Sequence, residues 1–375
     1  MLMYDNNAIR SRALKEFPVA KIVLGIGTSH TPLLSLPPEM WPEYARGDER
    51  NPELSFPPHG YVMSFPRAVE KLKAEGTSKY TGPGPFADQS ARFQKALDTL
   101  ASSLQAAEAD VTVIVSDDQD EWFYEHNMPR FAVYWGDSVP LIPRSIVPGG
   151  GEMARMIAQG YGDVPMDVPV ASRFGRFLVE YLCDHDFDVA HLTHVQQPYG
   201  GKVARRYPTP DGELNSVRET PTHDQGLPHG FAFIVKRLYN MQPRPILPVF
   251  QNTCYPPNTP SARRSYQLGQ AIAAAIKAWD EPARVAVIAS GGLSHFVVDE
   301  EQDRALLGAL EKKDSQTLRT LPKERLFSAT SESLNWVALG GVFEKEPHTF
   351  ELLDYVPVYR TPANTGGGWA FGRWQ

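Results

Sequence analysis

Four short apolar runs, separated by amphipathic segments, constrain the fold of this 375-residue chain more than any other feature. Each run is rich in Val and Ile and ends in polar or turn-forming residues, which is typical of a strand buried on both faces. The sequence therefore predicts buried strands at 20–26, 111–115, 246–250 and 284–289, with weaker candidates at 131–135 and 188–192.

Helical periodicity separates these predicted strands. Between 90 and 109, large apolar residues recur at spacings of four, three and four, from Phe93 to Leu104, which places them on one face of a helix. The same reasoning predicts helices at 261–279, 172–182, 301–310 and 333–343. Strands that alternate with helices predict an α/β fold in which a central sheet is covered by helices on both faces.

Two long stretches interrupt this alternation, at about 35–85 and about 196–227. Both are polar, the first is rich in proline, and stretches of this length are usually functional lids or disordered segments. We read them as insertions in a single domain, 20–375, which follows an N-terminal extension, 1–19. The insertions are also candidates to cover an active site.

Composition excludes several classes of protein. The net charge of −7 provides no basic surplus for a phosphate backbone, so we expect no nucleic-acid partner. Two cysteines exclude a disulfide scaffold and favour a cytoplasmic location. No apolar run approaches the roughly 20 residues of a membrane span, so no membrane partner is expected. The motifs of P-loop kinases, Rossmann dehydrogenases, serine hydrolases and zincins are absent.

Polar residues follow all four strong strands, at the ends where parallel sheets bind their ligands. His30 follows the first strand, an acidic run at 117–121 follows the second, and His295 follows the fourth after two glycines. We predict a site at this edge with His30 and His295 as catalytic residues. A hydrogen-bonded loop histidine and a solvated acidic loop are the structural alternatives.

The end of the second insertion supplies further candidates. His229 precedes an apolar run that should be buried, so it is a third catalytic candidate, and His223 is a candidate substrate contact. Arg205, Arg206 and Arg218 could bind a substrate carboxylate, although arginines of a solvated loop would look the same.

Six segments, in this order, together resemble a known family. They are GTSHTP, VIVSDDQDEWF, NTCYPPN, VIASGGLSHF, SESLNWVALGG and TPANTGGG. The chain from about Lys21 onward resembles the class III extradiol ring-cleavage dioxygenases, and in particular the catalytic subunit of the protocatechuate 4,5-dioxygenase type. The resemblance implies an α/β sandwich, a non-haem Fe(II) held by two histidines and one glutamate, and an acid/base histidine. It also implies O2 and a small phenolic or aromatic-acid substrate as partners, and assembly as a homo-oligomer.

The resemblance assigns roles residue by residue. His30 matches the first iron ligand and His295 the acid/base histidine, while His229 lies close to the place of a secondary histidine, near Gln225. Gln119 falls at the position of the second histidine ligand and Asn335 at that of the glutamate. With Asp118, these two amides become candidate substrate contacts. Carboxylates that could rebuild the ligand set are Glu332, Asp118 and Asp120.

Three functions remain open from the sequence. The first is ring cleavage of a catechol-like or phenolic aromatic acid with Fe(II). The second is a metal-independent hydrolase, lyase or tautomerase that uses a histidine cluster for acid/base chemistry. The third is an inactive partner subunit of a dioxygenase.

Overall fold

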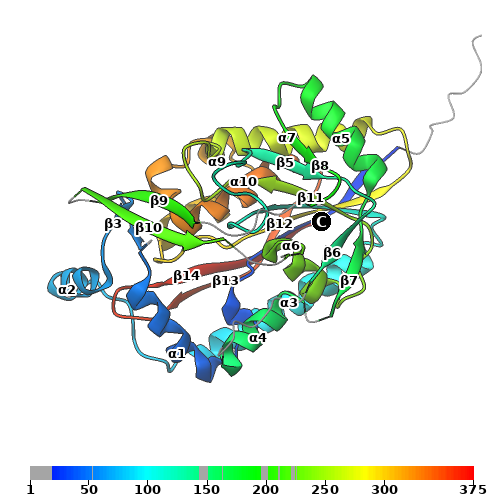
Figure 1. Ribbon diagram of the computed structural model, residues 1–375. Helices are drawn as coiled ribbons and strands as arrows, with labels where there is room; N and C mark the ends of the chain where they lie inside the picture. Colours follow the sequence, from blue (N-terminus) through cyan, green and yellow to red (C-terminus); the bar gives the residue numbers. More distant parts are fainter. Residues whose placement is uncertain are drawn as a thin grey trace, which may run out of the picture.

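The computed structural model describes residues 19–375 except 53, 143–150, 163, 196–201, 210–211, 221–223 and 225. Within these ranges, an eight-stranded sheet runs through the molecule in the order β13-β14-β1-β12-β4-β11-β5-β8 (Figure 1). The predicted N-terminal extension lies outside the described residues up to position 18.

The parallel centre of the sheet consists of the four strongly predicted strands. They are β1 (Lys21–Thr28), β12 (Arg284–Ser290), β4 (Val111–Asp117) and β11 (Ile246–Gln251). β12 pairs in parallel with both β1 and β4, and β4 pairs in parallel with β11, so all four carboxyl ends meet at one edge. The weaker predictions are also confirmed, as β5 (Phe131–Tyr134) and β8 (Ala190–Leu192).

Two strands at the other side of the sheet were not predicted. β13 (Phe350–Tyr359) and β14 (Gly366–Trp374) form an antiparallel hairpin, and β14 pairs antiparallel with β1. The glycines of β14 permit close packing, since a Cβ at Gly368 would lie 1.9 Å from Asp303 Oδ2. Glycine is depleted in ordinary strands, which explains why the pattern was not recognised.

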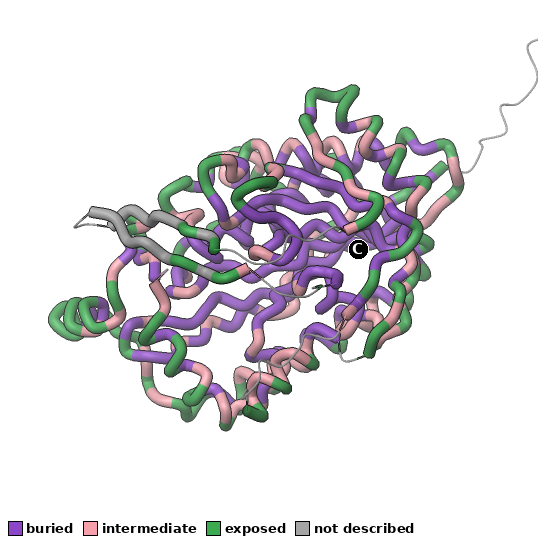
Figure 2. The backbone as a smooth tube through the Cα atoms, in the orientation of Figure 1, coloured by how far each residue is buried: buried purple, intermediate pink, exposed green. Residues whose placement is uncertain are grey.

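Helices cover both faces of the sheet, as predicted. α7 (Ala262–Ala278) and α10 (Ser333–Val342) pack together on one face, flanked by α5 (Ser172–Asp184) and α8 (Glu300–Glu311). α3 (Phe86–Ala106) and α6 (His229–Phe233) lie on the opposite face, and α6 continues into a π-helical turn, Ile234–Leu238. Figure 2 shows the buried strands between these partly exposed helices. The α/β fold class is thereby confirmed.

Both predicted insertions contain regular structure. The β9–β10 hairpin of the second insertion extends from the body of the molecule (Figure 1). The first insertion holds short helices and a small hairpin. The remaining elements are η1 (Pro32–Leu34), η2 (Pro38–Met40), α1 (Trp41–Ala45), η3 (Arg46–Arg50), β2 (Ser55–Phe56), β3 (Tyr61–Val62), α2 (Phe65–Glu75), β6 (Ser138–Leu141), α4 (Glu152–Gly160), β7 (Met166–Pro169), β9 (Lys202–Thr209), β10 (Gly212–Glu219), α9 (Ser315–Arg319), η5 (Lys323–Arg325) and η6 (Ser328–Glu332).

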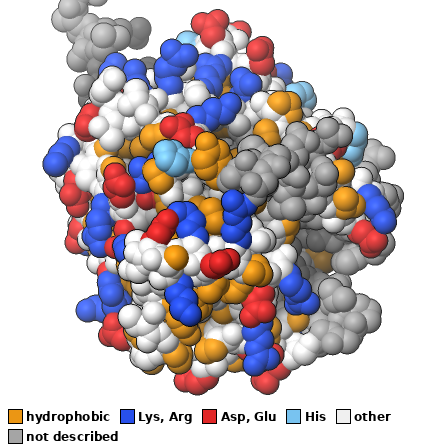
Figure 3. All heavy atoms as spheres, turned by 90° about the vertical axis from the view of Figure 1, so that its left-hand side faces the viewer, with side chains coloured by type: hydrophobic (Ala, Val, Ile, Leu, Met, Phe, Trp, Pro, Cys, Tyr) orange, Lys and Arg blue, Asp and Glu red, His pale blue; other side chains and the backbone are white. Residues whose placement is uncertain are grey.

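The surface carries charges of both signs. On the face drawn in Figure 3, Lys and Arg side chains alternate with Asp and Glu side chains, with hydrophobic side chains between them. Within the described ranges, none of the helices combines the length and the apolar character that crossing a bilayer requires.

Candidate active site

A cavity of about 350 Å³ opens at the edge where the parallel strands end. Four residues predicted from the sequence line it, namely His30, Gln119, His229 and His295. Glu121, Glu332, Tyr161 and Trp369 add two carboxylates and two aromatic rings to the wall. The volume lies in the range of small-molecule sites, so the cavity is large enough for a single-ring aromatic compound.

His30 presents an unprotonated nitrogen to this cavity. Its Nδ1 lies 3.0 Å from Ser290 Oγ, and that hydroxyl donates its own proton to the carbonyl of Gly230 at 2.6 Å. Ser290 therefore accepts from His30, which assigns the proton to Nδ1. Nε2 has no hydrogen-bond partner among the described residues and lies 3.5 Å from Glu332 Oε2. Burial lowers the pKa of His30 to about 3, so the ring is neutral at pH 7.

Glu332 ends the short η6 helix and is buried beside His30. Its Oε1 accepts hydrogen bonds from Gln119 Nε2 at 2.7 Å and from His295 Nε2 at 3.2 Å. Its Oε2 accepts from the backbone N–H of Gly292 at 2.7 Å. Burial raises the pKa of this carboxyl, but the charge and hydrogen bond of the neighbouring His295 outweigh burial and lower the pKa. We therefore treat Glu332 as ionised.

Both ring nitrogens of His295 face acceptors. Nδ1 lies 2.8 Å from the carbonyl oxygen of Leu293, and Nε2 lies 3.2 Å from Glu332 Oε1. Because a carbonyl and a carboxylate can only accept, these two contacts favour the protonated form of the ring. Burial lowers the pKa of His295, but the charge and hydrogen bond of Glu332 outweigh it and raise the pKa. The backbone of His295 is held by Thr330, whose hydroxyl bonds both the N–H and the carbonyl.

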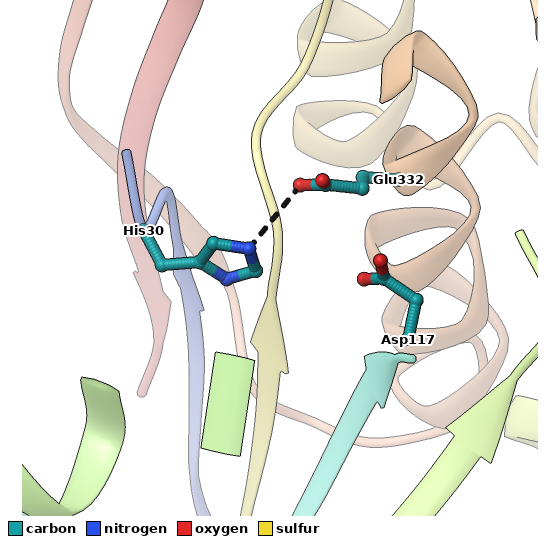
Figure 4. A group of neighbouring side chains, drawn as sticks. All are labelled: His30, Asp117 and Glu332. Carbon is teal, nitrogen blue, oxygen red and sulfur yellow. Dashed lines mark ion pairs between the residues drawn. The ribbon is translucent and has the colours of Figure 1, made fainter. Parts of the chain in front are cut away.

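Asp117 completes a group of three potential ligands. It is the last residue of β4, is fully buried, and accepts from Asn335 Nδ2 at 3.2 Å and from Gln119 Nε2 at 3.1 Å. Burial and the charge of Glu332 raise the pKa of Asp117 to about 7. Ligand atoms of His30, Asp117 and Glu332 lie within 4.8 Å of one another, and the three side chains converge from three elements (Figure 4).

These three residues fit a divalent cation. The lone pair of His30 Nε2 faces the carboxylate of Glu332, and the buried carboxyl of Asp117 lies nearby, so a bound cation would relieve the repulsion among these donors. One imidazole and two carboxylates match the ligand preferences of Fe(II), Mn(II) and similar ions. The fit rests on the unpartnered nitrogen and on the chemistry of the donors.

The structure corrects the expected places of Asn335 and Asp118. Asn335 is fully buried and bonds Asp117, the Ser290 carbonyl and Gln251, and it does not line the cavity. Glu332, one of the open alternatives, stands beside His30 instead. Asp118 caps the turn after β4 by accepting from the N–H groups of Glu121 and Trp122. Neither residue is among those that line the cavity.

Gln119 lines the cavity and joins the two carboxylates. Its Nε2 donates both to Asp117 and to Glu332, so the amide holds the pair together. The acidic run is buried rather than solvated, with Asp117, Asp118 and Glu121 at 0%, 3% and 5% exposure. The solvated-loop alternative is wrong for these three residues.

His229 begins α6 and is held by a second carboxylate. Its Nδ1 bonds Glu121 Oε1, and its backbone N–H donates to Glu121 Oε2 at 3.0 Å. The ring meets His30 edge-on with 4.7 Å between centroids. Gly230 permits close packing here, because a Cβ on it would lie 3.0 Å from His30 Cε1 and 2.2 Å from Ser116 Oγ. The structure thus places His229 beside His30.

Several candidates of the second insertion cannot be placed. His223 and Gln225 lie outside the described residues. The backbones of Arg205, Arg206 and Arg218 belong to the β9–β10 hairpin, and their side chains lie outside the described part of the structure.

Comparison with known proteins now identifies the family. The family model of the catalytic LigB subunit of aromatic ring-opening dioxygenases matches residues 88–361, nearly three quarters of the chain. The chain belongs to this family. One curated relative, gallate dioxygenase of Pseudomonas putida, is 39% identical over 80 residues, which span 20% of this chain and 23% of the relative. This match spans less than a quarter of the relative's length. Membership of the family, rather than this match, indicates that the chain is a dioxygenase-like protein.

Two parts of this LigB-family site were missed by sequence reasoning. Glu121 was read only as part of an acidic run, although its position four residues after a strand end is compatible with the cavity edge. Arg360 lines the cavity and was not singled out, because the strand before it was not predicted. Glu332 was named only as an alternative, since the resemblance places Asn335, three residues later, at the position of the family's glutamate.

Proposed function

We propose that this LigB-family chain is an extradiol-type ring-cleavage dioxygenase that uses Fe(II) and O2 on a catechol-like or phenolic aromatic acid. One observation supports the proposal most directly: the unprotonated Nε2 of His30 faces Glu332, beside Asp117, at the wall of a cavity of suitable size. Family membership supplies the reaction class, and the relative named gallate dioxygenase is consistent with a hydroxylated aromatic acid.

His30 and Glu332, with Asp117 as the third candidate, would hold the metal. Bound by these residues, Fe(II) would supply open coordination positions for a phenol and O2 and the redox chemistry that ring cleavage requires. Gln119 keeps the two carboxylates in place through its amide hydrogens. The donor set contains one imidazole and two carboxylates, whereas the resemblance implies two imidazoles and one carboxylate.

His295 is the proposed acid/base residue. Its Nε2 faces Glu332 at the cavity wall, and the ring packs near Trp369 with 5.3 Å between centroids. In the neutral ring, the proton stays on Nδ1, which bonds the carbonyl of Leu293, so Nε2 can take a phenolic proton and return it later in the reaction. A positioned histidine of this kind contributes about 10² to 10⁴ in rate.

His229 is proposed as a second proton-handling residue. Because Glu121 accepts from Nδ1, the neutral ring carries its proton there and has Nε2 unprotonated. His229 lines the cavity on the side of Tyr161, whose ring it meets edge-on at 5.6 Å. A hydroxyl of the substrate on that side would therefore lie beside the His229 ring.

The test combines metal analysis with O2 uptake. Protein purified without oxygen and offered Fe(II) should retain about one iron per chain and consume O2 with catechol, protocatechuate or gallate. Removal of the metal by a chelator should abolish uptake, and Fe(II) should restore it. Protein that holds no metal, and turns over hydrolase or lyase substrates in the presence of a chelator, would support the metal-independent alternative instead. Full metal loading with no turnover of any phenol would point to the inactive-subunit alternative.

A further inference from the structure

Arg360 brings a permanent positive charge to the wall of the cavity. It follows β13 and lines the cavity together with Tyr44, yet only 4% of the residue is exposed. Among the described residues that line this cavity, Arg360 is the sole Lys or Arg. A guanidinium is costly to bury without hydrogen-bond acceptors, so the partners of Arg360 decide which of its N–H groups stay available.

Asp48 fixes the orientation of this guanidinium. Arg360 Nε donates to Asp48 Oδ2 at 3.1 Å, and Nη2 donates to Asp48 Oδ1 at 2.9 Å. The hydroxyl of Thr365 also donates to Asp48 Oδ2 at 2.7 Å, and the Tyr44 ring lies 5.0 Å from the guanidinium carbon. Nε and Nη2 of the guanidinium thus bond Asp48, and Nη1 donates to no protein acceptor in the described part of the chain. Nη1 is the donor that remains for a ligand.

The backbone places Arg360 on the same wall as His295. The N–H of Arg360 bonds the carbonyl of Thr365 at 2.7 Å, and the next residue, Gly366, bonds the carbonyl of Phe296 at 2.8 Å. Phe296 directly follows His295, and both line the cavity. A compound whose phenolic oxygens lie near His295 can therefore direct another ring substituent toward Arg360.

We propose that Arg360, oriented by Asp48, binds the carboxylate of an aromatic-acid substrate through Nη1. The inference rests on the proposed function, and it names the residue that selects an acid over an uncharged phenol. Asp48 neutralises the charge of the guanidinium. The preference for an acid over an uncharged phenol therefore arises from the charge-assisted hydrogen bond at Nη1 rather than from net charge. A bond of this kind corresponds to about a 10- to 100-fold difference in affinity.

The test compares two probes of nearly equal shape on the iron-loaded protein without oxygen. Protocatechuate carries the carboxylate, and 3,4-dihydroxybenzamide replaces it with an uncharged amide. Calorimetric titration should show that the wild type binds the acid about 10- to 100-fold more tightly. Arg360→Gln should remove most of this preference by weakening the acid, while the affinity for the amide changes less than about threefold. Equal losses for both probes, or no loss, would overturn the proposal.

Two further variants keep the test decisive. Arg325→Gln removes a comparable pair with Asp299 that does not line the cavity, and it should leave the preference unchanged. If Arg360→Gln does not fold because Asp48 loses its partner, the double variant Arg360→Gln/Asp48→Asn removes both charges, and the same loss of preference is expected. Wild-type protein that binds both probes equally contradicts this subsite alone, whereas protein that binds neither contradicts the proposed function as well.

Discussion

Glu121 accepts hydrogen bonds from both the backbone and the imidazole of His229, 108 residues further along the chain. One carboxylate therefore sets the start of α6, the orientation of the ring and the nitrogen that carries the proton. His295 and Glu332 form a second pair of the same kind on the cavity wall. The cavity thus holds two histidines whose protonation is fixed by separate carboxylates.

The first prediction concerns the Glu121–His229 pair. His229→Ala should lower kcat by about 10² to 10⁴, because the site loses a positioned proton-handling group. Glu121→Gln should lower kcat by about 10- to 100-fold with little change in KM, since partners that orient a functional histidine have effects of this size. Steady-state kinetics of O2 uptake measures both. Glu125→Gln, an exposed carboxylate of the same segment, is the control. Normal kinetics in Glu121→Gln would remove the positioning role.

The second prediction concerns metal retention. His30→Ala and Glu332→Gln should each lower the iron retained after anaerobic loading by more than about tenfold, since even the loss of an outer partner costs about 10- to 100-fold in affinity. Elemental analysis gives the result directly. A variant that is inactive but carries as much iron as the wild type would show that the substituted residue is not a ligand.

The third prediction separates proton transfer from metal binding. His295→Ala should lower turnover by about 10² to 10⁴ and keep the iron, because its ring contacts Glu332 but supplies no ligand atom to the group of three. Iron content and O2 uptake are measured on the same preparation. Near-normal turnover would exclude His295 as the acid/base residue.

The fourth prediction concerns the pH dependence of stability. Burial raises the pKa of Asp303 to about 7, although hydrogen bonds from Ser294 and Tyr355 oppose the rise. The unfolded chain releases this proton near 3.8, so the folded state binds more protons between about pH 4 and pH 7. The contribution of Asp303 to the free energy of unfolding therefore falls as pH rises through this window. Urea unfolding at several pH values should show a weaker decline in Asp303→Asn. Parallel curves would contradict the assignment.

The fifth prediction concerns the packing of α7 against α10. A Cβ at Gly269 would lie 1.7 Å from the carbonyl oxygen of Ala338, so Gly269→Ala should lower the free energy of unfolding by about 1 to 3 kcal/mol. Gly308 in α8 has nothing within 4 Å of the same position, and Gly308→Ala should raise stability by about 0.4 to 1 kcal/mol. Denaturant unfolding of both variants tests the contrast. Effects of the same sign would show that helix propensity, rather than packing, dominates.

The parallel centre of the fold was predictable because its strands are buried on both faces. Such strands require continuous apolar residues, and Val113, Ile114 and Val115 of β4 are all 0% exposed. β14 follows no such rule, since its glycines and aromatic residues serve close approach to β13 and to Asp303. The sequence of β14, whose glycines allow close packing, therefore shows no periodic pattern of apolar residues.

The histidines of the site were predictable from their place after strands, but their partners were not. His30 and His295 both follow strands whose carboxyl ends meet. Glu121 reaches His229 across 108 residues, and Asp48 reaches Arg360 across 312. Pairings at such separations are set by the whole fold, and a single sequence gives no local pattern for them.

The position of β14 beside β1 has a consequence for synthesis. Ser29, just after β1, bonds Ala370 of β14 across 341 residues, so one edge of β1 gains its neighbour only after nearly all the chain has been made. At about 5 to 20 residues per second, the ribosome needs roughly 20 to 70 s to cover that distance. Throughout this interval the edge of an apolar strand is available to pair with other nascent chains. Yield in a foreign host should therefore depend on chaperone supply and growth temperature more than on the stability of the finished protein.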